Sequence, residues 1–398
     1  MKRVFICSEV SFPRGGAASN YIEYLALSLI EGGYHPVVIG QGKNSEEDLC
    51  GETYVYNAIH YYNYPSQTKV SRYKLKRFID ANLYSGKQIV GVLKKLRLSS
   101  EDYIIFYSRN CFTIEPVISY ANLKGTMASM AVTEHREDSH YKNQLLSWQS
   151  KYAFKYSISR TKSVIPISRH LEKYFQERGC RTLLLPCMAN PYEYSFDIDK
   201  SSKFVNFIYS GRDFAKDSFE TMLKSFTLLT AEEKKKVHFH LTGVKHERLV
   251  EYLREERKLL GELESVLTIH PWLEYQELVK LVKQMDYLFI AREINQTTLA
   301  NFPSKVPEMM CYGVVPLVSR VGDYTDLYLT DGKDSLIFDG CTPEDGVNAI
   351  RRAIELPKEK RLGMRMQARK TAEEKFYYGV WAERIGEFIE KCKLEGVV

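Results

Sequence analysis

Short apolar runs that alternate with amphipathic helical segments constrain the fold of this chain more than any other feature. Residues 3–7 form the first apolar run, a glycine-rich turn follows, and apolar side chains from Ile22 onward recur at the helical spacing of three and four. Gly32 and Gly33 end this helix, and residues 36–39 form the next apolar run. A strand, a helix and a second strand in this order predict a βαβ unit and therefore a buried parallel sheet.

The same pattern begins again half-way along the chain. Residues 190–203 carry turn formers with little periodicity, which favours a domain boundary there. We therefore expect two doubly wound α/β domains, at 1–195 and 196–375, and a last helix at 376–398. Further strands are expected at 103–107, 130–133, 163–167, 182–185, 204–209, 237–241, 266–269, 287–290, 314–318 and 335–338.

Composition excludes several classes of protein. The 398 residues contain no run of about 20 apolar residues, which a membrane-spanning helix requires, and the first residues lack the apolar core of a signal peptide. The eight cysteines are scattered without a Cys-x-x-Cys pair, so we expect reduced thiols, no metal site and a cytoplasmic location.

The positive charge of the chain is concentrated in one segment. The net charge is +6, and nine Lys or Arg residues with one acidic residue lie between Lys69 and Arg97. A nucleic-acid-binding protein would be basic over a whole domain, so nucleic acid is not an expected partner. The basic segment fits a solvated helix face and equally a dock for an anionic membrane surface or a lipid-diphosphate acceptor.

A glycine-rich loop between the first strand and the first helix is the first candidate binding site. Gly15 and Gly16 let backbone N–H groups approach a ligand, and the helix N-terminus behind them favours an anion. A tight turn that only starts a helix explains these glycines as well. The G-x-G-x-x-G fingerprint and the P-loop are absent, and no acidic residue ends the second strand, so a nicotinamide dehydrogenase is not expected.

Two cations follow the first strand of the second domain. Arg212 and Lys216 stand where the carboxyl end of a parallel strand opens, and a guanidinium beside an ammonium suits a diphosphate. Solvated surface cations are the alternative. The next residue, Asp217, predicts a capping box with Glu220 for the following helix.

A third candidate site lies between residues 301 and 319. Ser304 is expected to cap a short helix that Gly313 ends, and Glu308 stands near the first turn of that helix. A carboxylate there can accept hydrogen bonds from both hydroxyls of a ribose. It can also simply be favourable with the helix dipole.

Together these segments resemble the retaining glycosyltransferases of family 4 (group 1), in particular their bacterial polysaccharide branch. The resemblance covers nearly the whole chain, and its most specific part is Phe-Pro-Ser-Lys at 302–305 through Glu308 to Gly-Val-Val-Pro at 313–316. It implies the GT-B fold, in which an acceptor-side and a nucleotide-sugar-binding Rossmann-like domain face a central cleft and the last helix packs back on the first domain. Further matching segments are the Gly-Gly loop, 164–175, 209–212 with Lys216, 286–290 and 322–323.

The resemblance implies roles for three sets of residues. The donor-binding residues would be Gly15, Gly16, Arg212, Lys216, Ser304, Lys305 and Glu308. The catalytic residues would be His135, Arg212 and Lys216. On the acceptor side would lie Arg109 and Glu134.

The resemblance also implies a reaction. A sugar would pass, with retained configuration, from a UDP- or GDP-linked donor to a hydroxyl of a saccharide or lipid-linked saccharide, in polysaccharide or glycoconjugate biosynthesis. No cofactor or metal ion is expected, because the cations of the protein can neutralise the leaving diphosphate. The enzyme would be cytoplasmic and peripheral at the inner face of the membrane.

One position departs from the family pattern. The family has a glutamate eight positions before Glu308, beside the donor sugar, and this chain has Ala300 there, with Asn301 and Pro303 in place of two glycines. An active transferase is the first hypothesis, and a nucleotide-sugar-binding protein with lost or weak catalysis is the second. The third is a GT-B enzyme of another reaction, such as an epimerase, which requires carboxylates that the sequence does not offer.

Overall fold

The chain forms two compact α/β units. The computed structural model describes residues 2–13, 15–64, 73, 83–135, 144–196, 203–211, 216–253 and 258–395. Residues 1–188 and 378–398 form the first unit, and residues 189–377 form the second. The first unit ends before residue 195, because Ala189 pairs with Tyr377 and its N–H donates to Phe376 O at 2.8 Å within the second unit.

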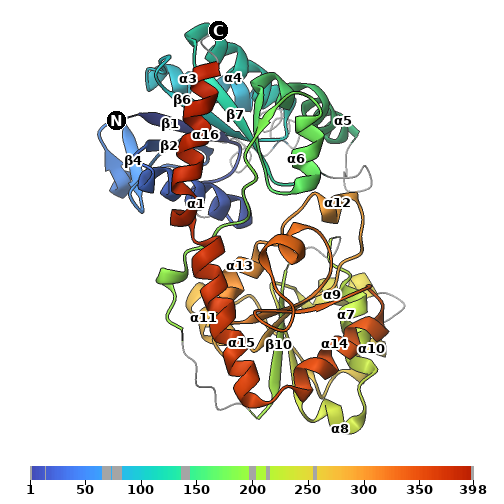
Figure 1. The fold of residues 1–398 in the computed structure, drawn as a ribbon. Coiled ribbons are helices and arrows are strands. Elements are labelled where there is room, and N and C mark those ends of the chain that lie inside the picture. Colours follow the sequence, from blue (N-terminus) through green and yellow to red (C-terminus); the bar gives the residue numbers. More distant parts are fainter. Residues whose placement is uncertain are drawn as a thin grey trace. The chain divides into compact units, whose positions relative to one another are not determined.

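The first unit is built on a sheet with helices packed around it (Figure 1). The sheet has nine strands in the order β3-β4-β5-β2-β1-β6-β7-β8-β9. The pairs β3–β4 and β4–β5 are antiparallel, and all other neighbouring strands run parallel. The strands are β1 (Arg3–Ser8), β2 (His35–Gln41), β3 (Leu49–Cys50), β4 (Thr53–Tyr56), β5 (Ile59–Tyr64), β6 (Tyr103–Tyr107), β7 (Met127–Val132), β8 (Ser163–Pro166) and β9 (Arg181–Thr182).

Helices cover this sheet, and the last helix of the chain is one of them. Tyr34 donates a hydrogen bond to Glu390 Oε1 at 2.8 Å, and Lys2 forms an ion pair with the same carboxylate, so α16 is fixed to the start of the chain. The helices are α1 (Ala17–Glu31), α3 (Ser85–Lys95), α4 (Cys111–Lys124), α5 (Gln144–Tyr152) with its continuations η5 (Ala153–Ser157) and η6 (Ile158–Thr161), α6 (Arg169–Gln176) and α16 (Ala382–Glu395).

The second unit is built on a sheet of six parallel strands in the order β12-β11-β10-β13-β14-β15. Counted from β10, this is the order 3-2-1-4-5-6 of a Rossmann fold, so the strand order reverses between β10 and β13. The expected doubly wound α/β fold is therefore confirmed. The strands are β10 (Val205–Ser210), β11 (Val237–Thr242), β12 (Leu267–Ile269), β13 (Tyr287–Ile290), β14 (Val315–Ser319) and β15 (Leu336–Phe338).

The helices of the second unit bury apolar stripes against this sheet. On α7 the apolar stripe of Phe219, Met222, Leu223 and Phe226 is fully buried, and the Phe226 ring stacks on Phe239 with centroids 4.6 Å apart. The helices are α7 (Phe219–Thr227), α8 (Ala231–Lys234), α9 (His246–Leu253), α10 (Lys258–Glu262), α11 (Tyr275–Val282), α12 (Gln296–Leu299), α13 (Lys305–Met310), α14 (Pro343–Glu355) and α15 (Lys358–Thr371).

Across the described ranges, no helix has both the length and the apolar composition needed to cross a membrane.

Three imidazoles meet at the β11–β12 edge of the second sheet. His240 Nδ1 lies 2.9 Å from His270 Nε2, and the rings of His238 and His240 are 4.7 Å apart. Burial, together with repulsion from the two neighbouring imidazoles, lowers the pKa of His240 to about 3. Burial also lowers the pKa of His238 and of His270. The structure therefore holds these side chains neutral.

We expect the second unit to lose stability in mild acid because of this cluster. The folded-state pKa of His240 lies below its unfolded value, so its contribution is complete at neutral pH and is lost as the pH falls from about 6.5 towards 3. Between about pH 7 and pH 4.5, the wild type should lose about 1–2 kcal/mol more stability than His240→Gln. Urea unfolding followed by hydrogen exchange of β10–β12 peptides measures this, and equal losses would contradict it.

Candidate functional site

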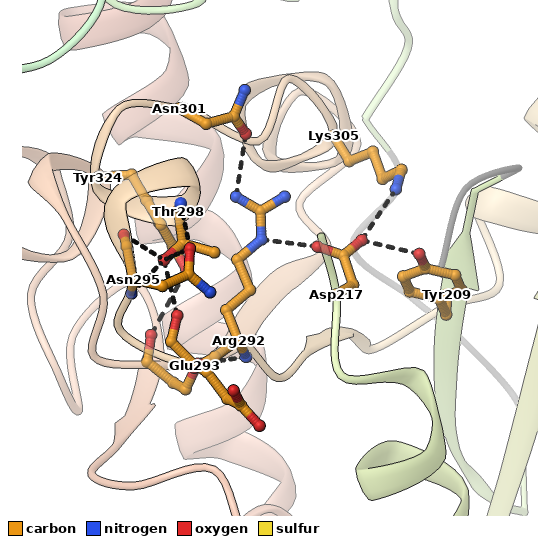
Figure 2. A network of polar contacts seen from close by, with 10 residues as sticks. Tyr209, Asp217, Arg292, Glu293, Asn295, Thr298, Asn301, Lys305 and Tyr324 are labelled. Carbon is orange, nitrogen blue, oxygen red and sulfur yellow. Dashed lines mark hydrogen bonds and ion pairs between the residues drawn. The ribbon is translucent and has the colours of Figure 1, made fainter. Parts of the chain in front are cut away.

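Polar side chains of the second unit gather where its strand order reverses. Tyr209 lies in β10, Asp217 follows β10, and Arg292 follows β13 (Figure 2). In open α/β sheets, ligands bind outside the carboxyl ends of the strands at this point. The sheet topology therefore marks these residues as the candidate site.

Asp217 and Arg292 form a buried ion pair at the centre of this site. Arg292 Nε donates to Asp217 Oδ1 at 2.6 Å, and the two side chains are only 4% and 3% exposed, respectively. Tyr209 donates to Asp217 Oδ2 at 2.7 Å, and Arg292 also donates to Asn301 Oδ1 at 3.1 Å. Burial alone would raise the pKa of Asp217, but Arg292, Lys305 and Tyr209 hold it well below its ordinary value. Asp217 is therefore a carboxylate.

The capping box expected for Asp217 and Glu220 is wrong. Ser218 is the N-cap of α7 and forms no side-chain cap hydrogen bond, whereas Glu220 pairs with Lys224 at 2.6 Å. The Asp217 carboxylate is turned into the buried network, where a guanidinium binds it more strongly than a backbone N–H would.

Lys305 adds a second cation to the pair. It is the first residue of α13, and its Nζ lies 3.5 Å from Asp217 Oδ2 and 4.6 Å from the centroid of the Tyr209 ring. Burial and the nearby Arg292 lower the pKa of Lys305, while Asp217 acts in the opposite direction. The side chain remains 25% exposed. One carboxylate thus faces two cations, so these three side chains together carry an excess positive charge beside the surface.

Gly211 packs closely against this site. A Cβ at this position would lie 2.7 Å from the Tyr209 hydroxyl oxygen and 2.8 Å from Lys305 Nζ. Any side chain would therefore displace the ammonium. Lys216 is half-buried just before Asp217, whereas Arg212 lies outside the described residues, so its role stays a prediction.

The loop between β13 and α13 is held by its own hydrogen bonds. Asn295 caps α12 by accepting from Thr298 N at 2.9 Å, and the Thr298 hydroxyl donates to Glu293 O at 2.6 Å (Figure 2). Ala300, at the position of the missing family carboxylate, follows α12 and is fully buried. The next residue, Asn301, supports Arg292 instead.

Ser304, Lys305 and Glu308 all belong to α13 or its cap. Ser304 is the N-cap, but its side chain makes no cap hydrogen bond, so the expected capping by that side chain is wrong. Glu308 is half-buried, and its N–H donates to Ser304 O at 3.3 Å. Because they are three positions apart on one helix, Lys305 and Glu308 lie on the same face.

A second polar cluster lies at the carboxyl ends of β1, β6 and β7 in the first unit. Ser108 donates to Glu9 Oε1 at 2.8 Å, and Arg109 forms an ion pair with Glu134. Burial raises the pKa of Glu9, although hydrogen bonds from Thr113 and Ser108 and the charge of Arg109 oppose this shift. The structure thus brings the two predicted acceptor-side residues into contact with each other.

His135 and the glycine loop also follow strands of the first sheet. The His135 ring stacks on Phe154 with centroids 4.0 Å apart and planes 4° from parallel. Gly15 is exposed just ahead of Gly16, which is the N-cap of α1 with a φ of 106°, a conformation that favours glycine. The catalytic and donor-binding roles of these residues stay predictions. Of the basic segment from Lys69 to Arg97, residues 69–72 and 74–82 lie outside the described residues, and the rest includes α3.

Sequence reasoning missed Glu9, Arg292 and the role of Asp217. Glu9 follows directly on a buried strand that the sequence did predict, and Arg292 lies two residues after the end of another. A charged residue at the carboxyl end of a parallel strand was the available signal, because that edge is where ligands bind.

Comparison with known families decides what the second unit is. Residues 193–371 match the model of the family described as "Glycosyl transferases group 1". The second unit is a group 1 glycosyl transferase domain. The match begins and ends close to the bounds of the unit and includes the whole buried network.

Solved structures resemble this chain over nearly its whole length. Sucrose-phosphate synthase from Thermosynechococcus elongatus is 12% identical with a TM-score of 0.73, over 100% of both chains. Anabaena HepE in complex with UDP-glucose is 12% identical with a TM-score of 0.68, over 98% of this chain and 100% of HepE. The lipopolysaccharide outer core galactosyltransferase WaaB is 16% identical with a TM-score of 0.62, over 98% of this chain and 99% of WaaB.

These identities are low, and the likeness shows the fold. The chain has the GT-B fold, as the sequence predicted. No curated protein matches the chain in sequence.

Proposed function

We propose that this glycosyl transferase moves a sugar from a nucleoside-diphosphate sugar to a hydroxyl of a saccharide or lipid-linked saccharide, with retained anomeric configuration. The observation that carries the proposal is the excess positive charge of Asp217, Arg292 and Lys305 at the β10–β13 switch point. A diphosphate is the anion that such a site suits, and a protein of the same fold, HepE, has been solved with UDP-glucose.

Catalysis would be mainly electrostatic. Negative charge builds on the diphosphate as the glycosidic bond breaks, and fixed cations stabilise it without reorganising. Lys305 would supply this charge together with Arg212 and Lys216, so the proposal needs no metal ion or cofactor. The leaving phosphate would take the proton of the acceptor hydroxyl on the same face of the sugar.

The remaining predicted residues would bind and orient the substrates. Glu308 would accept hydrogen bonds from the ribose hydroxyls, while Ser304, Gly15 and Gly16 would contact the donor. His135 would hydrogen-bond the donor sugar near the reacting carbon. The ion pair of Arg109 and Glu134 would face the acceptor.

The proposed setting is polysaccharide or glycoconjugate assembly in the cytoplasm, at the inner face of the membrane, with the Lys69–Arg97 segment against anionic lipid. Ala300 supports a second candidate, a GT-B protein that binds a nucleotide-sugar with lost or weak turnover. Its buried methyl group stands where the family has a carboxylate. Hydrolysis of the donor in the absence of acceptor separates the two candidates, since only the enzyme releases free sugar.

We expect either UDP and its sugar derivatives or GDP and its sugar derivatives to raise the melting temperature of the protein. A ligand at about 100 times its Kd adds about 2.7 kcal/mol to the stability of the folded state. The shift should be absent in Glu308→Ala and unchanged in Lys358→Met, whose side chain lies in the first turn of α15. No shift with any nucleotide would contradict both candidate functions.

A further inference from the structure

An exposed aromatic stripe runs along the helix that α5 and η5 form in the first unit. Its residues recur at spacings of three and four, which places them on one face of the helix. The rings of Trp148 and Tyr152 are 5.5 Å apart, and those of Tyr152 and Tyr156 are 5.1 Å apart. The aromatic stripe consists of Leu145, Trp148, Tyr152 and Tyr156, which are 37%, 51%, 39% and 49% exposed.

The opposite face of the same helix is packed into the unit. Ala153 and Phe154 are buried, and the Phe154 ring contacts Phe175 and Tyr174 as well as the stacked His135. The buried face therefore fixes the helix, and the core does not require large apolar side chains on the outer face. A continuous exposed apolar surface of this kind marks an interaction site.

The charged residues on the helix that carries the aromatic stripe are all basic. Residues 144–171 contain five Lys or Arg residues and no Asp or Glu. Lys151 and Lys155 are exposed on the same turns as the aromatic stripe, and Lys155 Nζ lies 5.0 Å from the centroid of the Tyr156 ring. Further along, Arg160 pairs with Glu115 of α4.

We propose that the aromatic stripe, with Lys151 and Lys155, binds the surface of an anionic lipid bilayer. Trp and Tyr rings favour the headgroup level of a membrane, and lysines on the flank of an amphipathic helix contact acidic headgroups while their stems lie along apolar surface. A neutral saccharide would also stack on the rings, but it offers nothing to the two lysines. The aromatic stripe shares no residue with the Lys69–Arg97 segment or with the candidate site of the second unit.

Vesicle sedimentation tests the proposal with matched variants of the full chain. The wild type should bind vesicles of phosphatidylcholine with phosphatidylglycerol far more tightly than vesicles of phosphatidylcholine alone. Two double variants should each weaken this binding at least about tenfold: Lys151→Glu with Lys155→Glu, and Trp148→Ser with Tyr152→Ser. Two controls of equal chemistry in the second unit should bind as the wild type does: Trp272→Ser with Tyr275→Ser, and Lys358→Glu with Lys360→Glu.

A fluorescence measurement places the aromatic stripe directly. In a Trp272→Phe, Trp381→Phe background, Trp148 is the remaining tryptophan. Its emission should shift to the blue with anionic vesicles and be quenched by lipids brominated on the acyl chain. Unchanged emission, or a shift caused by a soluble neutral polysaccharide and not by vesicles, would overturn the proposal. The stripe variants should still show the rise in melting temperature that a nucleotide causes in the wild type. This control separates a loss of membrane binding from a failure of the proposed reaction.

Discussion

Replacing Arg292 by Met should destabilise the second unit by about 3–5 kcal/mol. The change removes the guanidinium that pairs with Asp217 at 2.6 Å. Among the described residues, the carboxylate, which is 3% exposed, then keeps Lys305 and the Tyr209 hydroxyl as partners. A buried charge without its partner costs its full desolvation energy, and the pKa of Asp217 should rise as a result. Urea unfolding read by hydrogen exchange of α7 and β13 peptides measures the loss.

An exposed ion pair of similar length provides the control. Arg320 and Asp339 lie 2.7 Å apart, but their side chains are 48% and 82% exposed. Arg320→Met should therefore cost at most about 1 kcal/mol. A similar cost for both substitutions would show that burial does not set the energy of the Asp217–Arg292 pair.

The double variant Asp217→Asn with Arg292→Met sharpens the same prediction. Asp217→Asn alone leaves the buried Arg292 and the partly exposed Lys305 without their anion, and it should be as harmful as Arg292→Met. Together the two changes remove both charges, so the double variant should be more stable than the sum of the single losses predicts. The contribution of Asp217 is complete above its unfolded pKa of about 3.9 and is lost only as the pH falls below it.

Some strands of the fold can be predicted from the sequence, and others cannot. Strands β6 and β13 were predicted with their observed bounds, because a continuous apolar run between charged or turn-forming residues indicates a strand buried on both faces. Strands β3, β4 and β5 were missed. β3 has only two residues, and β4 and β5 are rich in tyrosine in place of a continuous apolar run.

Asp217 explains why the site itself was only partly predicted. The spacing between Asp217 and Glu220 fits the pattern of a helix capping box. Such a pattern depends only on nearby residues, so it carries no information about contacts with residues far along the chain. The partner that decides its orientation, Arg292, lies 75 positions along the chain and meets it only because β10 and β13 are neighbours in the sheet. Lys305 was predicted through the family resemblance, whereas its contact with Asp217 required the structure.

Replacing Lys305 by Met should lower kcat for sugar transfer by about 10²–10³-fold. The substitution removes the exposed cation of the site, while Asp217 keeps both Arg292 and the Tyr209 hydroxyl. Stability should therefore change far less than in Arg292→Met. The measurement is donor turnover together with the thermal shift caused by the nucleotide, which should also be weaker.

Two further variants separate a catalytic from a structural role for Lys305. Lys283→Met removes a lysine that precedes β13, at the opposite edge of the sheet, and should leave kcat unchanged. Lys305→Arg keeps the charge, so it should recover part of the nucleotide binding, although Gly211 and Tyr209 leave little room for a guanidinium. The prediction is contradicted if Lys305→Met unfolds as readily as Arg292→Met, yet turns over donor at the normal rate while it is folded. Lys305 would then have a structural role, and another cation would have to bind the diphosphate.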